Sequence, residues 1–264
     1  MAFGFKGVLF GVFLTSSLTS VFILECFFDF MSVIICGGCM RSGKSDDAMS
    51  IVEAYHNFGL KHILFQPEGN TRDVIDGMPV WRTGNYHFKR TYADASYYPG
   101  SKEVVKNLDK FDVFGFEEPH WINKEELLGI AHKINDRNKI MIVSGLNYFH
   151  NGAPVPQMEA LRGIKGSTYR QGVQALCETE LKNGEYNIAT RTQMLINGEF
   201  PRFDSPTDLP EASSERFLSK ETARQSTASY YPVCINHWTV LPPKDDRLFS
   251  NYKKYYLDIK EGIQ

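Results

Sequence analysis

Apolar runs separated by amphipathic segments form a regular pattern over the first part of the chain, and this pattern predicts the fold. Four runs have the length and composition of buried strands: 32–36, 61–65, 111–116 and 139–144. Residues 48–55 and 123–134 instead carry apolar side chains at helical spacing. Strands and helices in this order predict an α/β fold, with a parallel sheet that is covered by helices on both faces.

The segment between the second and third apolar runs lacks this regularity. Residues 66–103 are rich in Gly, Pro, Tyr and Asn. We expect a long loop there, with one short strand near Val80, and a loop of this length in a compact domain is usually functional or flexible.

The last third of the chain has a different character. Asn183-Gly184 and Asn197-Gly198 are hairpin-turn signals, so we expect a small β lobe. Residues 204–229 are poor in apolar side chains and predict a polar loop. Residues 251–263 are rich in Lys and Tyr and predict a surface helix.

The stretch between the first strand and the first helix has the residues that bind phosphate. Gly38-Cys39-Met40-Arg41-Ser42-Gly43-Lys44-Ser45 matches G-x-x-x-x-G-K-[ST], the P-loop pattern. Gly38 and Gly43 permit a tight turn whose amide N–H groups converge on a phosphate. Lys44 supplies a charge for the β- and γ-phosphates, and the Ser45 hydroxyl can bind Mg²⁺. A chance match is the alternative, and the strand–loop–helix context argues against it.

Two adjacent acids, Glu117 and Glu118, follow the third apolar run. Sites in parallel sheets lie at the carboxyl ends of the strands, so we expect both acids beside the P-loop. One carboxylate there can hold Mg²⁺, and the second can accept a proton from a nucleophile. Two solvated carboxylates at a strand end are the alternative.

Cys177, Cys234 and His237 have the chemistry of three zinc ligands. Glu180, three residues after Cys177, is a candidate for the fourth, because carboxylate oxygen also binds zinc. Two buried cysteines with a surface histidine would have the same spacing, and the sequence leaves both interpretations open.

Composition adds limits rather than a function. The chain has 264 residues, 42% of them hydrophobic and 23% charged, as in ordinary globular proteins. A net charge of −2 gives no reason to expect nucleic acid or an anionic membrane as a partner. The five cysteines do not suggest a disulfide framework, and Cys36 lies just before the P-loop and Cys39 within it, which favours a reducing, cytoplasmic location.

The first 30 residues stand apart. Residues 7–28 contain no Lys, Arg or Asp and are long enough to span a bilayer. Met31 directly precedes the first predicted strand, so translation from Met31 would make residues 1–30 an upstream extension. Both interpretations stay open, and this segment is excluded from the fold prediction.

These observations divide the chain into four parts. We expect a hydrophobic extension over 1–30, a P-loop nucleotide-binding domain over 31–171, a small zinc-ribbon-like β lobe over 172–245 and a C-terminal tail over 246–264.

Further segments follow the P-loop in a fixed order: Gln66-Pro67 with Asn70-Thr71-Arg72, 114–118, Gly145-Leu146-Asn147, Gly152-x-Pro154, 189–198, and Tyr230 with Cys234-x-x-His237. The ordered set resembles the thymidine kinases of the cellular and bacterial type that carry a zinc lobe. The resemblance covers about residues 31–242, and it is more specific than any single motif.

The chain departs from the family pattern at several positions. Arg41 stands where a Phe is usual, and Asn70 and Asn147 stand where Asp is usual. Glu180 occupies the place of the second zinc cysteine. The family's short V-G-G segment is not recognisable between residues 204 and 230.

The resemblance implies a role for each matched residue in phosphoryl transfer. Glu118 would be the general base on the deoxyribose 5′-hydroxyl. Glu117 would help Ser45 to hold Mg²⁺. Lys44 and Arg72 would stabilise the phosphates.

The resemblance also implies a base pocket and a metal centre. Met40, Trp121 and Tyr230 would line the pyrimidine pocket. Zn²⁺ would be bound by Cys177, Cys234 and His237, with Glu180 as the open fourth position. Family members are often homotetramers.

We therefore predict an ATP-dependent thymidine kinase, which forms dTMP in pyrimidine salvage for DNA synthesis. One alternative is a non-catalytic or differently specific P-loop protein that binds nucleotides. Another is a membrane-anchored P-loop ATPase, which depends only on residues 7–28.

Overall fold

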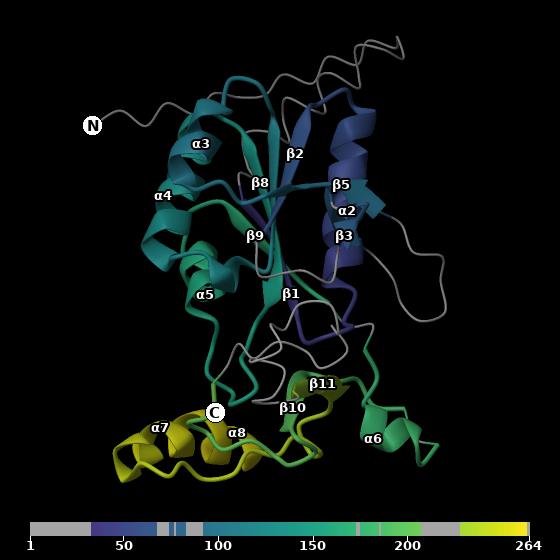
Figure 1. Ribbon diagram of the computed structural model, residues 1–264, viewed down its shortest axis with the longest axis vertical. Helices are drawn as coiled ribbons and strands as arrows, with labels where there is room; N and C mark the ends of the chain where they lie inside the picture. Colours follow the sequence, from purple (N-terminus) through teal and green to yellow (C-terminus); the bar gives the residue numbers. More distant parts are fainter. Residues whose placement is uncertain are drawn as a thin grey trace, which may run out of the picture.

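The computed structural model describes residues 33–67, 74–76, 78–82, 92–172, 175–184, 186–206 and 228–262. These residues form a six-stranded parallel sheet with helices on both faces, and a smaller lobe lies at one end (Figure 1). The predicted α/β fold is therefore confirmed. Residues 1–30, for which a membrane anchor was one interpretation, lie outside the described residues.

The sheet has the strand order β6-β2-β7-β8-β1-β9, with parallel pairing throughout. Its strands are β1 (Val33–Gly38), β2 (His62–Gln66), β6 (Ser96–Tyr97), β7 (Val113–Glu117), β8 (Ile140–Leu146) and β9 (Ser167–Gln171). The four predicted apolar runs correspond to the four inner strands. The edge strands β6 and β9 were not predicted, because they are short or polar and carry no apolar run.

Helices cover the two faces of the sheet unequally. They are α2 (Lys44–Asn57), α3 (Ser101–Lys106), α4 (Lys124–Asp136) and α5 (Pro156–Arg162). Figure 1 shows α3, α4 and α5 on one side of the sheet and α2 on the other. In β1, Val33 and Ile35 pack toward the first group, and Ile34 and Cys36 pack toward α2. Burial on both faces explains why these strands read as continuous apolar runs.

Asn123 and Glu126 have the spacing of a capping box, and only the first half of that motif forms at the start of α4. Asn123 caps the helix, because its side-chain oxygen accepts the backbone N–H of Glu126 at 3.1 Å. The Glu126 carboxylate does not reach back to Asn123. It accepts 2.8 Å hydrogen bonds from the Tyr98 hydroxyl and the Ser101 backbone N–H, so it ties α4 to the start of α3.

The segment 66–103 is more ordered than the predicted long loop. Its described residues include a three-stranded antiparallel sheet of β3 (Val74–Ile75), β4 (Met78–Arg82) and β5 (Tyr92–Asp94). The strand predicted near Val80 is β4. Trp81 in β4 is fully buried, and its indole N–H donates to the Phe65 carbonyl at 3.0 Å. The neighbours Val80 and Trp81 are both buried, so β4 lacks the alternating pattern that identifies a strand.

The lobe combines a two-stranded antiparallel sheet with short helices. Its elements are α6 (Glu178–Leu181), β10 (Arg191–Ile196), β11 (Ala228–Val233), η2 (Asp246–Leu248), α7 (Phe249–Tyr252), η3 (Lys253–Leu257) and α8 (Asp258–Lys260). The predicted turn at Asn197-Gly198 is present, with φ of 53° and 83°, directly after β10. The C-terminal helical segment is partly buried, because Tyr252 and Tyr256 pack in one cluster with Trp238. The proposed domain boundaries stay a prediction.

No helix in the described part of the chain has both the length and the hydropathy needed to cross a membrane. The apolar stretch 7–28 was not part of that search, because it lies outside the described residues.

Candidate functional site

The loop that carries the P-loop motif lies between β1 and α2, as the motif predicts. A Cβ atom on Gly38 would lie 2.1 Å from the Ser42 hydroxyl oxygen, so a larger residue here would force the buried Ser42 side chain to shift. Gly43 has φ of 83° at the N-cap of α2, a conformation that side chains disfavour. The loop therefore turns directly into the N-terminus of a 14-residue helix, where backbone N–H groups favour an anion.

Oxygen ligands for a hard cation gather at the first turn of α2. The Ser45 hydroxyl donates to a carboxylate oxygen of Glu117 at 2.8 Å, and the Ser144 hydroxyl oxygen lies 3.2 Å from that of Ser45. Glu117 ends β7, and Ser144 lies near the end of the neighbouring β8. Hydroxyl and carboxylate oxygens fit Mg²⁺ at the P-loop of a nucleotide site.

Glu118 lies one residue beyond this pair, at a sharp change of chain direction. Its backbone is left-handed, with φ of 48° and ψ of 56°, and its N–H donates to the Ser144 carbonyl at 2.8 Å. A left-handed non-glycine residue is uncommon, and such residues cluster at active sites. The 3₁₀ turn η1 (Pro119–Trp121) follows, and its Trp121 is 44% exposed.

Met40 and Tyr230 come from different parts of the chain. Met40 lies in the P-loop, and its backbone N–H donates to the Thr192 hydroxyl of β10 at 3.1 Å. Tyr230 lies on β11, opposite Met194 of β10. Two of the three predicted pocket residues are therefore associated with the β10–β11 ribbon, and the third, Trp121, lies in η1. Arg72, the predicted phosphate-binding arginine, lies outside the described residues.

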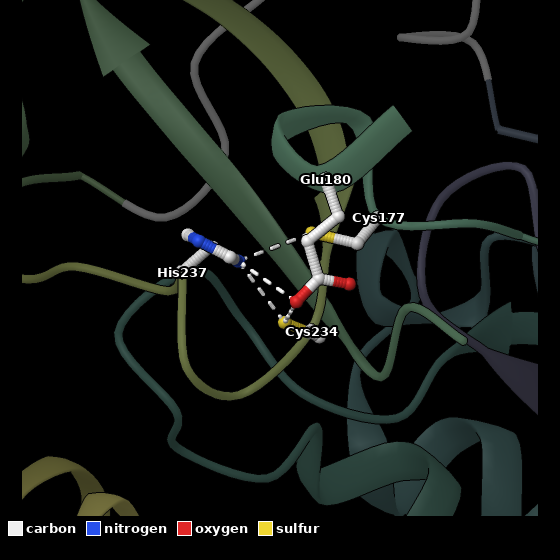
Figure 2. A group of neighbouring side chains, drawn as sticks. All are labelled: Cys177, Glu180, Cys234 and His237. Carbon is white, nitrogen blue, oxygen red and sulfur yellow. Dashed lines mark hydrogen bonds and ion pairs between the residues drawn. The ribbon is translucent and has the colours of Figure 1, made fainter. Parts of the chain in front are cut away.

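The four candidate zinc ligands lie together, as Figure 2 shows. Their ligand atoms are all within 4.8 Å of one another, and they come from Cys177, Glu180, Cys234 and His237. Cys177 precedes α6 and Glu180 lies within it, whereas Cys234 and His237 follow β11.

The chemistry of this group fits a zinc ion. The Nδ1 atom of His237 lies 3.6 Å from the Cys177 sulfur, 3.3 Å from the Cys234 sulfur and 3.4 Å from a Glu180 oxygen. The other carboxylate oxygen of Glu180 is buried and has no hydrogen-bond partner. Burial raises the pKa of the Cys234 thiol, and a bound cation would instead favour the thiolate. Two thiolates, an imidazole and a carboxylate are a donor set that suits tetrahedral Zn²⁺.

The sequence missed three residues that contribute to these arrangements. Ser144 lies beside Ser45, and its position at the end of a predicted strand could have identified it as a site residue. Thr192 supports Met40, and Glu178 forms an ion pair with Arg41. Because these two contacts join segments more than 130 residues apart, no local sequence pattern could predict them.

Four of the five cysteines lie among the described residues. Cys36, Cys39, Cys177 and Cys234 are all buried free thiols.

Comparison with known families identifies a match over more than half of the chain. The thymidine kinase family model matches residues 31–196. The match includes the P-loop, Glu117, Glu118 and the first two candidate zinc ligands, and it ends at the last residue of β10.

Proposed function

Because this chain belongs to the thymidine kinase family, we propose that it transfers the γ-phosphoryl group of ATP to the 5′-hydroxyl of thymidine. The products would be dTMP and ADP. Family membership indicates a nucleoside kinase, and the choice of thymidine as the acceptor is the finer part of the proposal.

The observation that carries the proposal is the contact between the P-loop helix and the end of β7. The Ser45 hydroxyl lies 2.8 Å from a Glu117 carboxylate oxygen, and Glu118 is the next residue. Phosphoryl transfer requires alignment, charge neutralisation and a base on the attacking hydroxyl. In this proposal, Glu117 would serve charge neutralisation by holding Mg²⁺, and Glu118 would serve as the base, beside a loop suited to phosphate.

The proposed roles follow from this placement. Lys44 would bind the β- and γ-phosphates, together with Arg72 from outside the described residues. Ser45 and Glu117 would hold Mg²⁺, which neutralises phosphate charge when bound. Glu118 would accept the 5′-hydroxyl proton as the oxygen attacks the γ-phosphorus and the bond to the ADP oxygen breaks. Met40, Trp121 and Tyr230 would contact the pyrimidine.

The direct test measures phosphate transfer from labelled ATP to each of the four common deoxynucleosides in the presence of Mg²⁺. We expect thymidine to be the preferred acceptor. Glu118→Gln should lower kcat by roughly 10²–10⁴-fold, because it removes a general base. Glu125→Gln is the matched control, since that carboxylate is exposed on α4. Tight ATP binding without transfer to any deoxynucleoside would instead support a non-catalytic nucleotide-binding protein.

We also propose that Cys177, Glu180, Cys234 and His237 hold a structural Zn²⁺. The position of Glu180 Oε1 supports this assignment, because it lies 3.4 Å from both the Cys234 sulfur and His237 Nδ1. Metal analysis of the purified chain should find one zinc per chain, and Glu180→Ala should lower that content. Zinc content unchanged by this substitution would exclude Glu180 as a ligand. The homotetramer implied by the family resemblance stays a prediction, which light scattering can measure.

A further inference from the structure

We propose that Glu178 is a positioning residue that connects the metal group to the P-loop, so that zinc binding in the lobe tightens ATP binding. The inference rests on the proposed function, because it assumes that residues 38–45 bind ATP. It concerns how the chain shapes that site.

The first observation is an ion pair at the tip of the loop. The Arg41 guanidinium pairs with the Glu178 carboxylate, and both side chains are about one-third exposed. Arg41 has φ of 60°, in the left-handed region that non-glycine residues seldom adopt. Such a conformation is strained and persists only where surrounding contacts fix it. The ion pair with Glu178 is one such contact.

The two preceding loop residues also rest on the lobe. The Met40 backbone N–H donates to the Thr192 hydroxyl at 3.1 Å, and the Cys39 thiol donates to the Ala189 carbonyl at 3.4 Å. Cys39 is buried in a small cluster with Ala175 and Ala189. Three consecutive residues of the P-loop therefore depend on lobe residues for their placement.

Glu178 lies between two candidate metal ligands. Cys177 is the N-cap of α6, and Glu180 lies inside this helix of four residues. A single helical turn has little stability of its own, so its order depends on tertiary contacts. A metal ion held by Cys177 and Glu180 would fix both sides of Glu178, and thereby the carboxylate that pairs with Arg41.

Thr192 is connected to the other half of the metal group. It pairs with Pro232 across the β10–β11 ribbon, and β11 ends at Val233, immediately before Cys234. The metal group therefore adjoins both lobe segments that contact the loop. Zinc would act on the P-loop through two connections rather than one.

The expected size of the coupling is modest. A partly exposed ion pair contributes little, so we expect zinc to lower the ATP Kd by about two- to fivefold. Thermodynamic linkage requires the reciprocal effect, in which ATP tightens zinc binding by the same factor. If zinc only stabilised the fold, zinc and ATP would not change each other's affinity under conditions in which all of the protein is already folded.

The test measures binding rather than turnover. The full chain is stripped with a chelator, dialysed into Mg²⁺ and divided into samples with and without ZnCl₂. The Kd of a fluorescent ATP analogue is then measured for wild type, Glu178→Gln and Glu178→Asp. Glu199→Gln is the control, because its carboxylate is exposed elsewhere in the lobe. Circular dichroism on every sample identifies any variant that fails to fold.

We expect zinc to tighten ATP binding in wild type and in the control. Glu178→Gln should weaken ATP binding in the zinc form and should lose most of the zinc effect. Glu178→Asp should restore part of that effect. Equal Kd values with and without zinc in folded wild type would overturn the inference. So would tighter ATP binding in Glu178→Gln, because Arg41 would then act on phosphate directly. Absence of ATP binding would overturn this inference together with the proposed function. Zinc-dependent ATP binding without thymidine turnover would leave the inference standing and remove only the proposed function.

Discussion

The parallel sheet and the lobe are stabilised by different interactions, although the candidate site draws on both. The sheet buries apolar side chains on its two faces, so its stability comes from packing. The lobe has a two-stranded ribbon, which is marginal alone. Its buried cluster includes Cys177 and Cys234 beside Trp238 and two tyrosines. Polar contacts and a ligand therefore matter more to the lobe than to the sheet.

This difference separates two properties of the site. The Glu117 carboxylate lies at the end of β7, and the backbone of Glu118 is bonded to Ser144 of the neighbouring β8. The tip of the P-loop, at Cys39 and Met40, is fixed by the lobe. Conditions that loosen the lobe should change nucleotide binding before they unfold the sheet. The following predictions test that separation, from the largest expected effect to the smallest.

A substitution that leaves a cavity against the sheet should cause the largest loss of stability, and zinc should not alter that loss. Phe114 is fully buried in the cluster below α4, so Phe114→Ala should lower the free energy of unfolding by about 3–5 kcal/mol. Urea titration with and without ZnCl₂ measures this change. Phe249→Ala is the control in the lobe, because that ring is 49% exposed. A loss that depends strongly on zinc would show that the two regions unfold as one unit.

Acid should weaken the junction between the two regions through His150. The His150 side chain is 3% exposed, and the backbone carbonyl of His150 accepts the Trp238 indole N–H at 2.8 Å. Burial lowers the pKa of His150 to about 4, from an ordinary value of 6.5. As the pH falls, His150 is therefore protonated in the unfolded chain before it is protonated in the folded chain. The stability contributed by neutral His150 is present above pH 6.5 and is lost as the pH falls toward 4, by about 3 kcal/mol in total.

The matched measurement compares urea unfolding at pH 7 and pH 4.5 for wild type, His150→Asn and His132→Asn. The first substitution should reduce the pH dependence. The second should not, because His132 is exposed on α4. Identical pH dependence in all three proteins would contradict a buried neutral His150.

A smaller effect is expected at the C-terminal helix. The Lys260 ammonium donates to the carbonyls of Ile235, Asn236 and Trp238 at 2.6–2.7 Å. These carbonyls belong to the turn that carries His237. Lys260→Met should destabilise the lobe by about 1–3 kcal/mol, because it leaves these acceptors without a charged donor.

Hydrogen exchange of lobe amides and zinc retention against a chelator would both report this loss. Lys253→Met is the control on the same helical segment, because Lys253 is exposed. Unchanged zinc retention in Lys260→Met would mean that the turn holds its shape without the ammonium.

The same division explains what the sequence could predict. Inner strands such as β1 and β8 are apolar on both faces, and the P-loop motif is local, so both were visible in the pattern. Edge strand β9 was missed because its side chains are polar. The contact of Arg41 with Glu178 depends on how the lobe packs against the loop, and no spacing in the sequence encodes that distance. The approach of Glu180 to Cys234, across 54 residues, was instead one of the two interpretations that the sequence left open, because both side chains have the chemistry of zinc ligands.

That separation has a consequence for the order in which the protein is made. The last strand of the sheet ends at Gln171, and Cys177 and Glu180 follow soon after. Cys234 and His237 leave the ribosome much later. The sheet can therefore fold during translation, as N-terminal domains generally do, while half of the metal group is still unsynthesised. We expect ribosome-stalled chains that end near residue 200 to resist protease over the sheet, and zinc to protect the lobe only in chains that extend beyond His237.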